Sequence, residues 1–75
     1  MSYTSNELAK ANQQVALAER HISAQQEVVE CMRAAGISTE GADQLLIQFE
    51  ATLRRRIAER DRIELQLSWN HAEAA

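Results

Sequence analysis

The segment 36–41 holds both glycines of the chain and interrupts an otherwise continuous helical pattern. A helix is expected to end at Gly36, because glycine adopts the left-handed conformation of a helix C-terminus without steric cost. Ser38 is then placed to cap a second helix, with the negative charges of Glu40 and Asp43 near its start. So short a link predicts two helices that fold back on each other as antiparallel neighbours.

Composition favours helices throughout. Proline is absent, and the chain is rich in Ala, Glu, Gln, Arg and Leu, which are good helix formers. No run of alternating β-branched residues between turn signals supports a strand. We therefore predict a single all-α domain over residues 1–75, an antiparallel helical hairpin with helices at about 5–35 and 39–70, a turn at 36–38 and a frayed tail at 71–75.

The start of the first helix carries a capping signature. With Thr4 as N-cap, Glu7 occupies the third helical position and completes a capping box. Tyr3 and Leu8 have the spacing of a hydrophobic staple. These four residues predict where the helix begins.

The first helix has an apolar seam with the heptad spacing of a coiled coil. Its two positions are occupied by Leu8, Val15, Ile22 and Val29, and by Ala11, Ala18, Gln25 and Met32. Gln25 is the polar member, and two interpretations stay open: a residue hydrogen-bonded at the edge of the seam, or a polar layer that fixes the register.

The second helix gathers its main apolar face on Ala42, Leu45, Leu46, Phe49, Leu53, Ile57, Ile63 and Leu67. Folding the hairpin predicts Val29 beside Phe49. Arg60 shares this face, and we expect its aliphatic stem to lie along the seam with its charge in solvent or on Glu64. The alternative is a buried pair with Glu19 or with a carboxylate of another subunit.

Each helix also has a second apolar stripe, which a solitary hairpin would not need. A core this small rarely stabilises a domain alone, and the single cysteine, Cys31, excludes an internal disulfide. We therefore predict a homodimer that forms an antiparallel four-helix bundle. The expected interface consists of Leu17, Ala24, Val28, Ile47, Ala51, Ala58, Leu65 and Trp69.

Arginines form the densest charge cluster in a chain whose net charge is −3. The acidic balance argues against a surface built wholly for nucleic acid. Spacings to nearby carboxylates favour a solvated helix face. The alternative is RNA or DNA binding by the strip Arg54, Arg55, Arg56 and Arg62.

No catalytic, cofactor or metal site is predicted. His21 and Cys31 are too far apart on one helix to act together, and no zinc-ligand spacing or phosphate-binding loop is present. We expect a protein that is not an enzyme, has no cofactor, and binds a protein partner. The absence of a long apolar run and of an N-terminal signal pattern predicts a cytoplasmic location with no membrane span.

Part of the sequence resembles a group of short uncharacterised bacterial two-helix proteins. The similarity lies in the run 18–22 (AERHI), the glutamine-rich 25–27, the break at 34–39, and the segments 45–46 (LL) and 49–53 (FEATL). It covers roughly residues 18–62 and implies a helical hairpin. The group has no assigned activity, so the resemblance implies no site residue.

Overall fold

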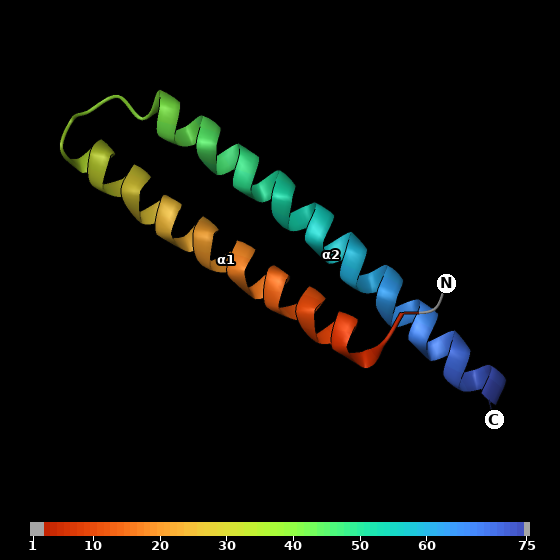
Figure 1. Ribbon diagram of the computed structural model, residues 1–75. Coiled ribbons are helices and arrows are strands. Elements are labelled where there is room, and N and C mark those ends of the chain that lie inside the picture. Colours follow the sequence, from red (N-terminus) through yellow and green to blue (C-terminus); the bar gives the residue numbers. More distant parts are fainter. Residues whose placement is uncertain (1–2, 75) are drawn as a thin grey trace.

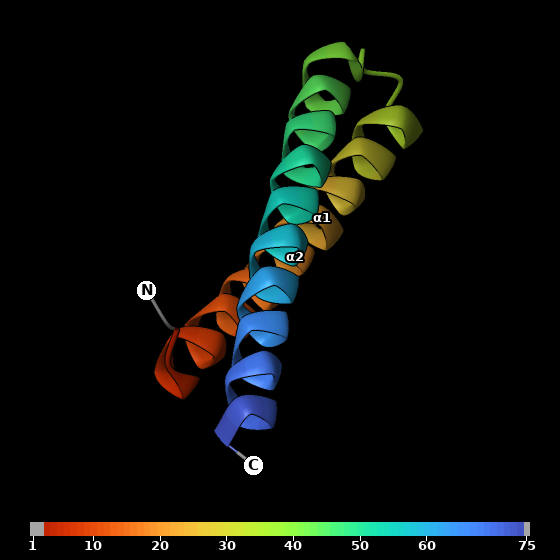
Figure 2. The ribbon, with the colours of Figure 1, turned by 90° about the vertical axis from the view of Figure 1, so that its right-hand side faces the viewer.

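The computed structural model describes residues 3–74, and the side chains among them up to residue 69; Met1, Ser2 and Ala75 lie outside the described residues. It contains two helices, α1 (Ser5–Ala34) and α2 (Glu40–Ala74), and no strand within residues 3–74. The helices lie side by side and antiparallel (Figure 1), and they cross at an angle (Figure 2). The predicted all-α hairpin is therefore confirmed as a fold, a rod of 60 × 15 × 14 Å.

Helix α1 begins at the predicted cap. Thr4 has an extended backbone (φ −110°, ψ 164°), and its Oγ1 accepts a hydrogen bond from the backbone N–H of Glu7 at 3.2 Å. The Thr4 hydroxyl in turn donates to Oε1 of Glu7 at 3.4 Å. The carboxylate thus contacts the capping hydroxyl, and one free N–H of the first turn is satisfied by the cap.

Helix α1 ends in a Schellman motif around Gly36. The backbone N–H of Gly36 donates to the carbonyl of Arg33 at 3.1 Å, and that of Ile37 donates to the carbonyl of Met32 at 2.9 Å. This pair of bonds requires a left-handed residue, and Gly36 has φ +73°. The glycine therefore ends α1 as predicted, with Ala35 as the C-cap.

The start of α2 differs from the prediction by one residue. The carbonyl of Thr39 accepts the helical hydrogen bond from the N–H of Asp43 at 2.7 Å, and the Thr39 hydroxyl donates to Oδ2 of Asp43 at 2.8 Å. Thr39 therefore holds the N-cap position, and the prediction of Ser38 is wrong. Ser38 is exposed in the link between the helices. This link covers residues 35–39 and is longer than the predicted 36–38, and Ile37 within it is still hydrogen-bonded to the last turn of α1.

The far end of α2 also differs. The helix continues to Ala74, past the predicted end near residue 70, and Ala75 lies outside the described residues. Alanine and glutamate favour helix, and neither glycine nor proline interrupts this segment. As a result α2 projects beyond the first turn of α1 (Figure 1).

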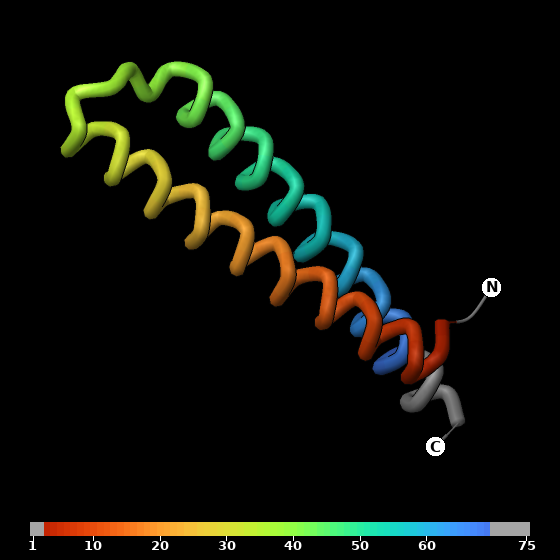
Figure 3. Tube along the Cα trace, turned by 60° about the vertical axis from the view of Figure 1, so that its left-hand side comes forward, coloured from red at the N-terminus to blue at the C-terminus, as the bar shows by residue number. Residues whose placement is uncertain are grey.

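The core between the helices is thin. Its buried side chains are Ala11, Val15, Ala18, Val29 and Ile63, and among the described residues no large side chain is completely buried. Small residues of α1 predominate in this set. Figure 3 shows the two helices running alongside each other from the turn toward the open end, and small side chains between them favour close packing.

The helices pair in a different register from the predicted one. Phe49 of α2 lies against His21, with ring centroids 5.6 Å apart, and not beside Val29. Val29 is about two turns further along α1. A seam that repeats every seven residues offers nearly equivalent apolar pairing one heptad away, so the pattern alone does not select the register.

Gln25 supplies a bond that depends on the register. Its Nε2 donates to the backbone carbonyl of Ala42 at 3.0 Å, and the pair is partly buried. Among the described residues this is the side-chain hydrogen bond that joins the two helices. The seam residue is therefore satisfied within the hairpin, close to the turn.

Candidate functional site

The large residues of the predicted interface are exposed in the single chain. Their exposed fractions are 39% for Leu17, 46% for Val28, 62% for Ile47, 66% for Leu65 and 67% for Trp69. Of the smaller members, Ala24 and Ala58 are exposed and Ala51 is half-buried. This apolar surface is large relative to the thin core, which makes it the first candidate for binding.

The structure does not place these residues on one surface. Leu17 borders a hollow between the helices that is also lined by Arg56 of α2. Ile47 is nine residues from Arg56, or about two and a half turns, and therefore lies on the opposite side of α2. We call Leu17, Ala24 and Val28 the α1 patch, and we define the α2 patch as Ile47, Ala51, Ala58, Leu65 and Trp69.

The α2 patch is continuous along its helix. Ala51, Ala58 and Leu65 follow one another at seven-residue intervals, and Ile47 and Trp69 extend the row by one turn at each end. The α1 patch faces the other side of the hairpin, so a single flat contact cannot cover both patches.

The arginines differ in how they are paired. Arg60 bonds to Oδ1 of Asp61 at 3.0 Å, its side chain is 30% exposed, and the expected partners Glu64 and Glu19 are not used. The reason is that the guanidinium at the seam edge reaches the adjacent carboxylate directly. Arg62 lies 3.5 Å from Oε2 of Glu59.

Three consecutive arginines, at 54–56, form no such ion pair within the part of the chain that the structure describes. Within the described residues, no carboxylate lies within 4.0 Å of Arg54, Arg55 or Arg56. Arg54 is four residues from Glu50 and Arg55 is four residues from Glu59, but neither spacing forms an ion pair among the described residues. Positive charge is left on the middle of α2.

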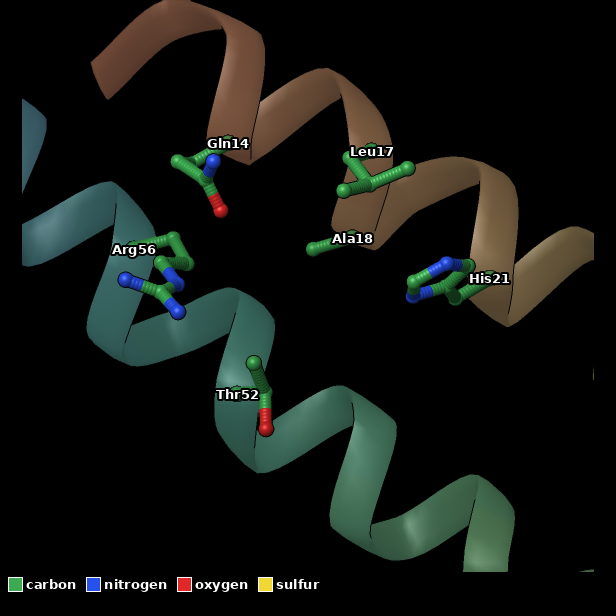
Figure 4. A pocket seen from close by; sticks show the side chains of 6 residues that line it. All are labelled: Gln14, Leu17, Ala18, His21, Thr52 and Arg56. Carbon is green, nitrogen blue, oxygen red and sulfur yellow. The ribbon is translucent and has the colours of Figure 1, made fainter. Parts of the chain in front are cut away.

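Two adjoining hollows lie beside these arginines. One, of about 180 Å³, is an open hollow between the two helices, and Figure 4 shows the side chains that line it: Gln14, Leu17, Ala18, His21, Thr52 and Arg56. The other, of about 400 Å³, is lined by Thr52, Arg55, Arg56 and Glu59. Because Thr52 and Arg56 belong to both, we treat the two hollows as one feature and call it the inter-helix groove.

Neighbouring contacts hold the side chains of the groove. The guanidinium of Arg55 donates to Oγ1 of Thr52 at 3.1 Å, and the ring of His21 packs against Phe49 at an interplanar angle of 37°. In Figure 4 the side chains of Arg56 and Gln14 lie on opposite sides of the hollow, one from each helix. Polar side chains from two helices therefore line one space.

Sequence reasoning missed Gln14 and Thr52 as site residues and left His21 without a role. Each is unremarkable on its own helix, and the group exists only in the observed register. Within α1 the spacing of Gln14, Leu17 and His21 shows that they share a side, but their partners on α2 follow only from the packing.

A third hollow, of about 350 Å³, lies nearer the turn between Gln26, Val29, Glu30, Arg33, Asp43 and Leu46. Two carboxylates and one guanidinium line it, so its net charge is negative and it does not favour an anion. Cys31 is a free, exposed thiol. No group of three or more His, Cys, Asp and Glu side chains within the described residues is arranged to hold a metal ion.

Neither α1 nor α2, within the described residues, has an apolar window of the length that crossing a bilayer requires. The chain matches no protein-family model, and no curated protein or solved structure is significantly similar to it. The resemblance to the short bacterial two-helix proteins accordingly stays a prediction.

Proposed function

We propose that this protein is a non-enzymatic interaction module that homodimerises through the α2 patch and binds a protein partner through the α1 patch. The observation that carries the proposal is the high exposure of large apolar side chains on two separate sides of a hairpin with a thin core. A dimer of this kind contains four helices, with the two copies of α2 in the middle. It modifies the predicted bundle, in which both patches would meet in one interface.

The α2 patch is self-complementary about Ala58. Ile47 and Trp69 lie eleven residues before and after Ala58, and Ala51 and Leu65 lie seven residues before and after it. A two-fold axis at Ala58 would therefore bring each small alanine at 51 against Leu65 of the second copy. This is the isologous arrangement typical of closed homodimers, in which one surface pairs with itself.

Charges beside the patch are balanced in the same antiparallel register. Arg55 would lie level with Asp61 of the second copy, a favourable pairing. Arg54 would lie level with Arg62 of the second copy, which is unfavourable. Because exposed pairs contribute little either way, apolar contacts dominate the dimer and its dependence on salt is expected to be weak.

The α1 patch remains open in this dimer, since it faces the other side of the hairpin. Leu17 and Val28 are large enough to anchor an apolar partner surface, and Ala24 between them permits close approach. Arg54, Arg55 and Arg56, which have no carboxylate partner among the described side chains, favour RNA or DNA binding as a second candidate function.

Molar mass in solution tests the dimer. Light scattering after size exclusion should give twice the 8.4 kDa of one chain for the wild type, and Ala58→Glu should give a monomer because it places two carboxylates at the axis. Ala16→Glu changes an exposed alanine outside both patches and should leave the dimer intact. A monomeric wild type, or an unchanged mass for Ala58→Glu, contradicts the proposal.

A further inference from the structure

We infer that the inter-helix groove binds the phosphate group of a small phosphorylated molecule. The groove faces the side of α2 opposite Ile47, so this site goes beyond the proposed dimer and stays open in it. The inference rests on three observations: two arginines without a carboxylate partner among the described residues, neutral polar side chains from both helices, and a concave surface between the helices.

The charge at the groove is positive because the nearby carboxylates are already engaged. Glu59 lines the groove but lies 3.5 Å from Arg62, and Asp61 is bonded to Arg60. Arg55 and Arg56 therefore face the groove without a carboxylate within 4.0 Å among the described residues. Two neighbouring guanidinium groups at one concave surface favour an anion, and guanidinium geometry matches phosphate oxygens.

Neutral polar side chains line the same space. The Thr52 oxygen accepts from Arg55 at 3.1 Å and so holds this guanidinium at the groove. The Gln14 carboxamide and the His21 ring line the groove from α1, and the ring packs against Phe49. An anion bonded to Arg56 and to the Gln14 amide group would contact both helices at once.

Shape favours a small ligand over a nucleic-acid strand. The part of the groove that both helices line, about 180 Å³, has room for a phosphate group, and Leu17 and Ala18 provide an apolar wall for an attached organic part. Among the described residues no Trp, Tyr or Phe lines the groove to stack on bases, which single-strand binders use. Arg54 and Arg62 line neither hollow.

Isothermal titration of the wild-type protein with inorganic phosphate and with pyrophosphate tests the site, with ¹H–¹⁵N spectra to locate the contacts. Saturable binding should perturb residues near Gln14, His21 and Thr52. Arg56→Gln should weaken binding by about tenfold or more, since it removes charge-assisted hydrogen bonds. Arg20→Gln, the same charge change at an exposed position of α1 outside the groove, should have little effect.

Other outcomes would overturn the inference. One is the absence of saturable phosphate and pyrophosphate binding by a wild type whose helical circular dichroism is intact. A second is equal weakening by Arg20→Gln and Arg56→Gln, which would show diffuse charge attraction. A third is tight, steeply salt-dependent binding of a single-stranded oligonucleotide that Arg54→Gln and Arg62→Gln weaken as much as Arg56→Gln, which would assign the strip to nucleic acid.

Discussion

The two ends of the hairpin differ in the contacts that join the helices. At the turn, backbone geometry is defined by hydrogen bonds: the Schellman motif at Gly36, the Thr39 contacts to Asp43, and the Gln25 bond to Ala42. At the open end, the helices meet through buried apolar contacts such as Ile63, and α2 projects past α1. The comparison teaches that buried apolar side chains stabilise both ends, with Val29 near the turn and Ile63 near the open end, whereas the side-chain hydrogen bond between the helices lies at the turn end among the described residues.

The largest expected effect is at the open end. Ile63→Ala removes the most buried α2 side chain, 4% exposed, and should lower the free energy of unfolding by about 2–4 kcal/mol. Leu45→Ala, at the turn end and 40% exposed, is the matched control and should cost less than half as much. Urea denaturation followed by circular dichroism measures both. An equal loss of unfolding free energy in the two variants would contradict the larger contribution assigned to Ile63.

Next in size is the glycine of the turn. Gly36→Val forces a β-branched residue into φ +73° and should cost about 1–2 kcal/mol from backbone strain alone, since no atom lies within 4 Å of the added Cβ. Gly41→Ala, within α2 and equally uncrowded, should instead stabilise the fold by about 0.5 kcal/mol. Thermal unfolding of the two variants should therefore shift in opposite directions, and a shift in the same direction would contradict the assigned role of Gly36.

A smaller effect is expected at the inter-helix hydrogen bond. Gln25→Ala removes the donor to the Ala42 carbonyl and should lower the free energy of unfolding by about 1 kcal/mol. Gln26→Ala, an exposed neighbour without this bond, should change it by less than about 0.5 kcal/mol. Nuclear Overhauser contacts between His21 and Phe49 report the register, and their loss in the Gln25 variant alone would show that the bond selects it.

The smallest effects compare the two helix starts. Thr4→Ala removes a hydroxyl that accepts from the Glu7 N–H and should cost about 0.5–1 kcal/mol. Ser38→Ala should be nearly neutral, because Thr39 and not Ser38 holds the cap position of α2. A larger loss for Ser38→Ala than for Thr4→Ala in chemical denaturation would restore the capping role that the sequence predicted for Ser38.

Local features of this fold were predictable from sequence, and relations between the helices were not. The cap at Thr4 and the stop at Gly36 follow from short-range chemistry, so they could be predicted. The pairing of Phe49 with His21 could not, because a heptad seam matches apolar residues in more than one register. The groove depends on that register, so the sequence alone could not predict that Gln14 and Thr52 line the same hollow.

The bond from Gln25 to the Ala42 carbonyl has a consequence for the order of folding. It joins residues only seventeen apart in sequence, so the loop that closes it is short and costs less chain entropy than any contact at the open end. If the helices meet first near the turn, the Gln25 bond would set their register there before Ile63 is buried. In kinetic terms, loss of this bond should let misaligned hairpins accumulate during refolding, and these would convert slowly because the seam must separate before it can slip.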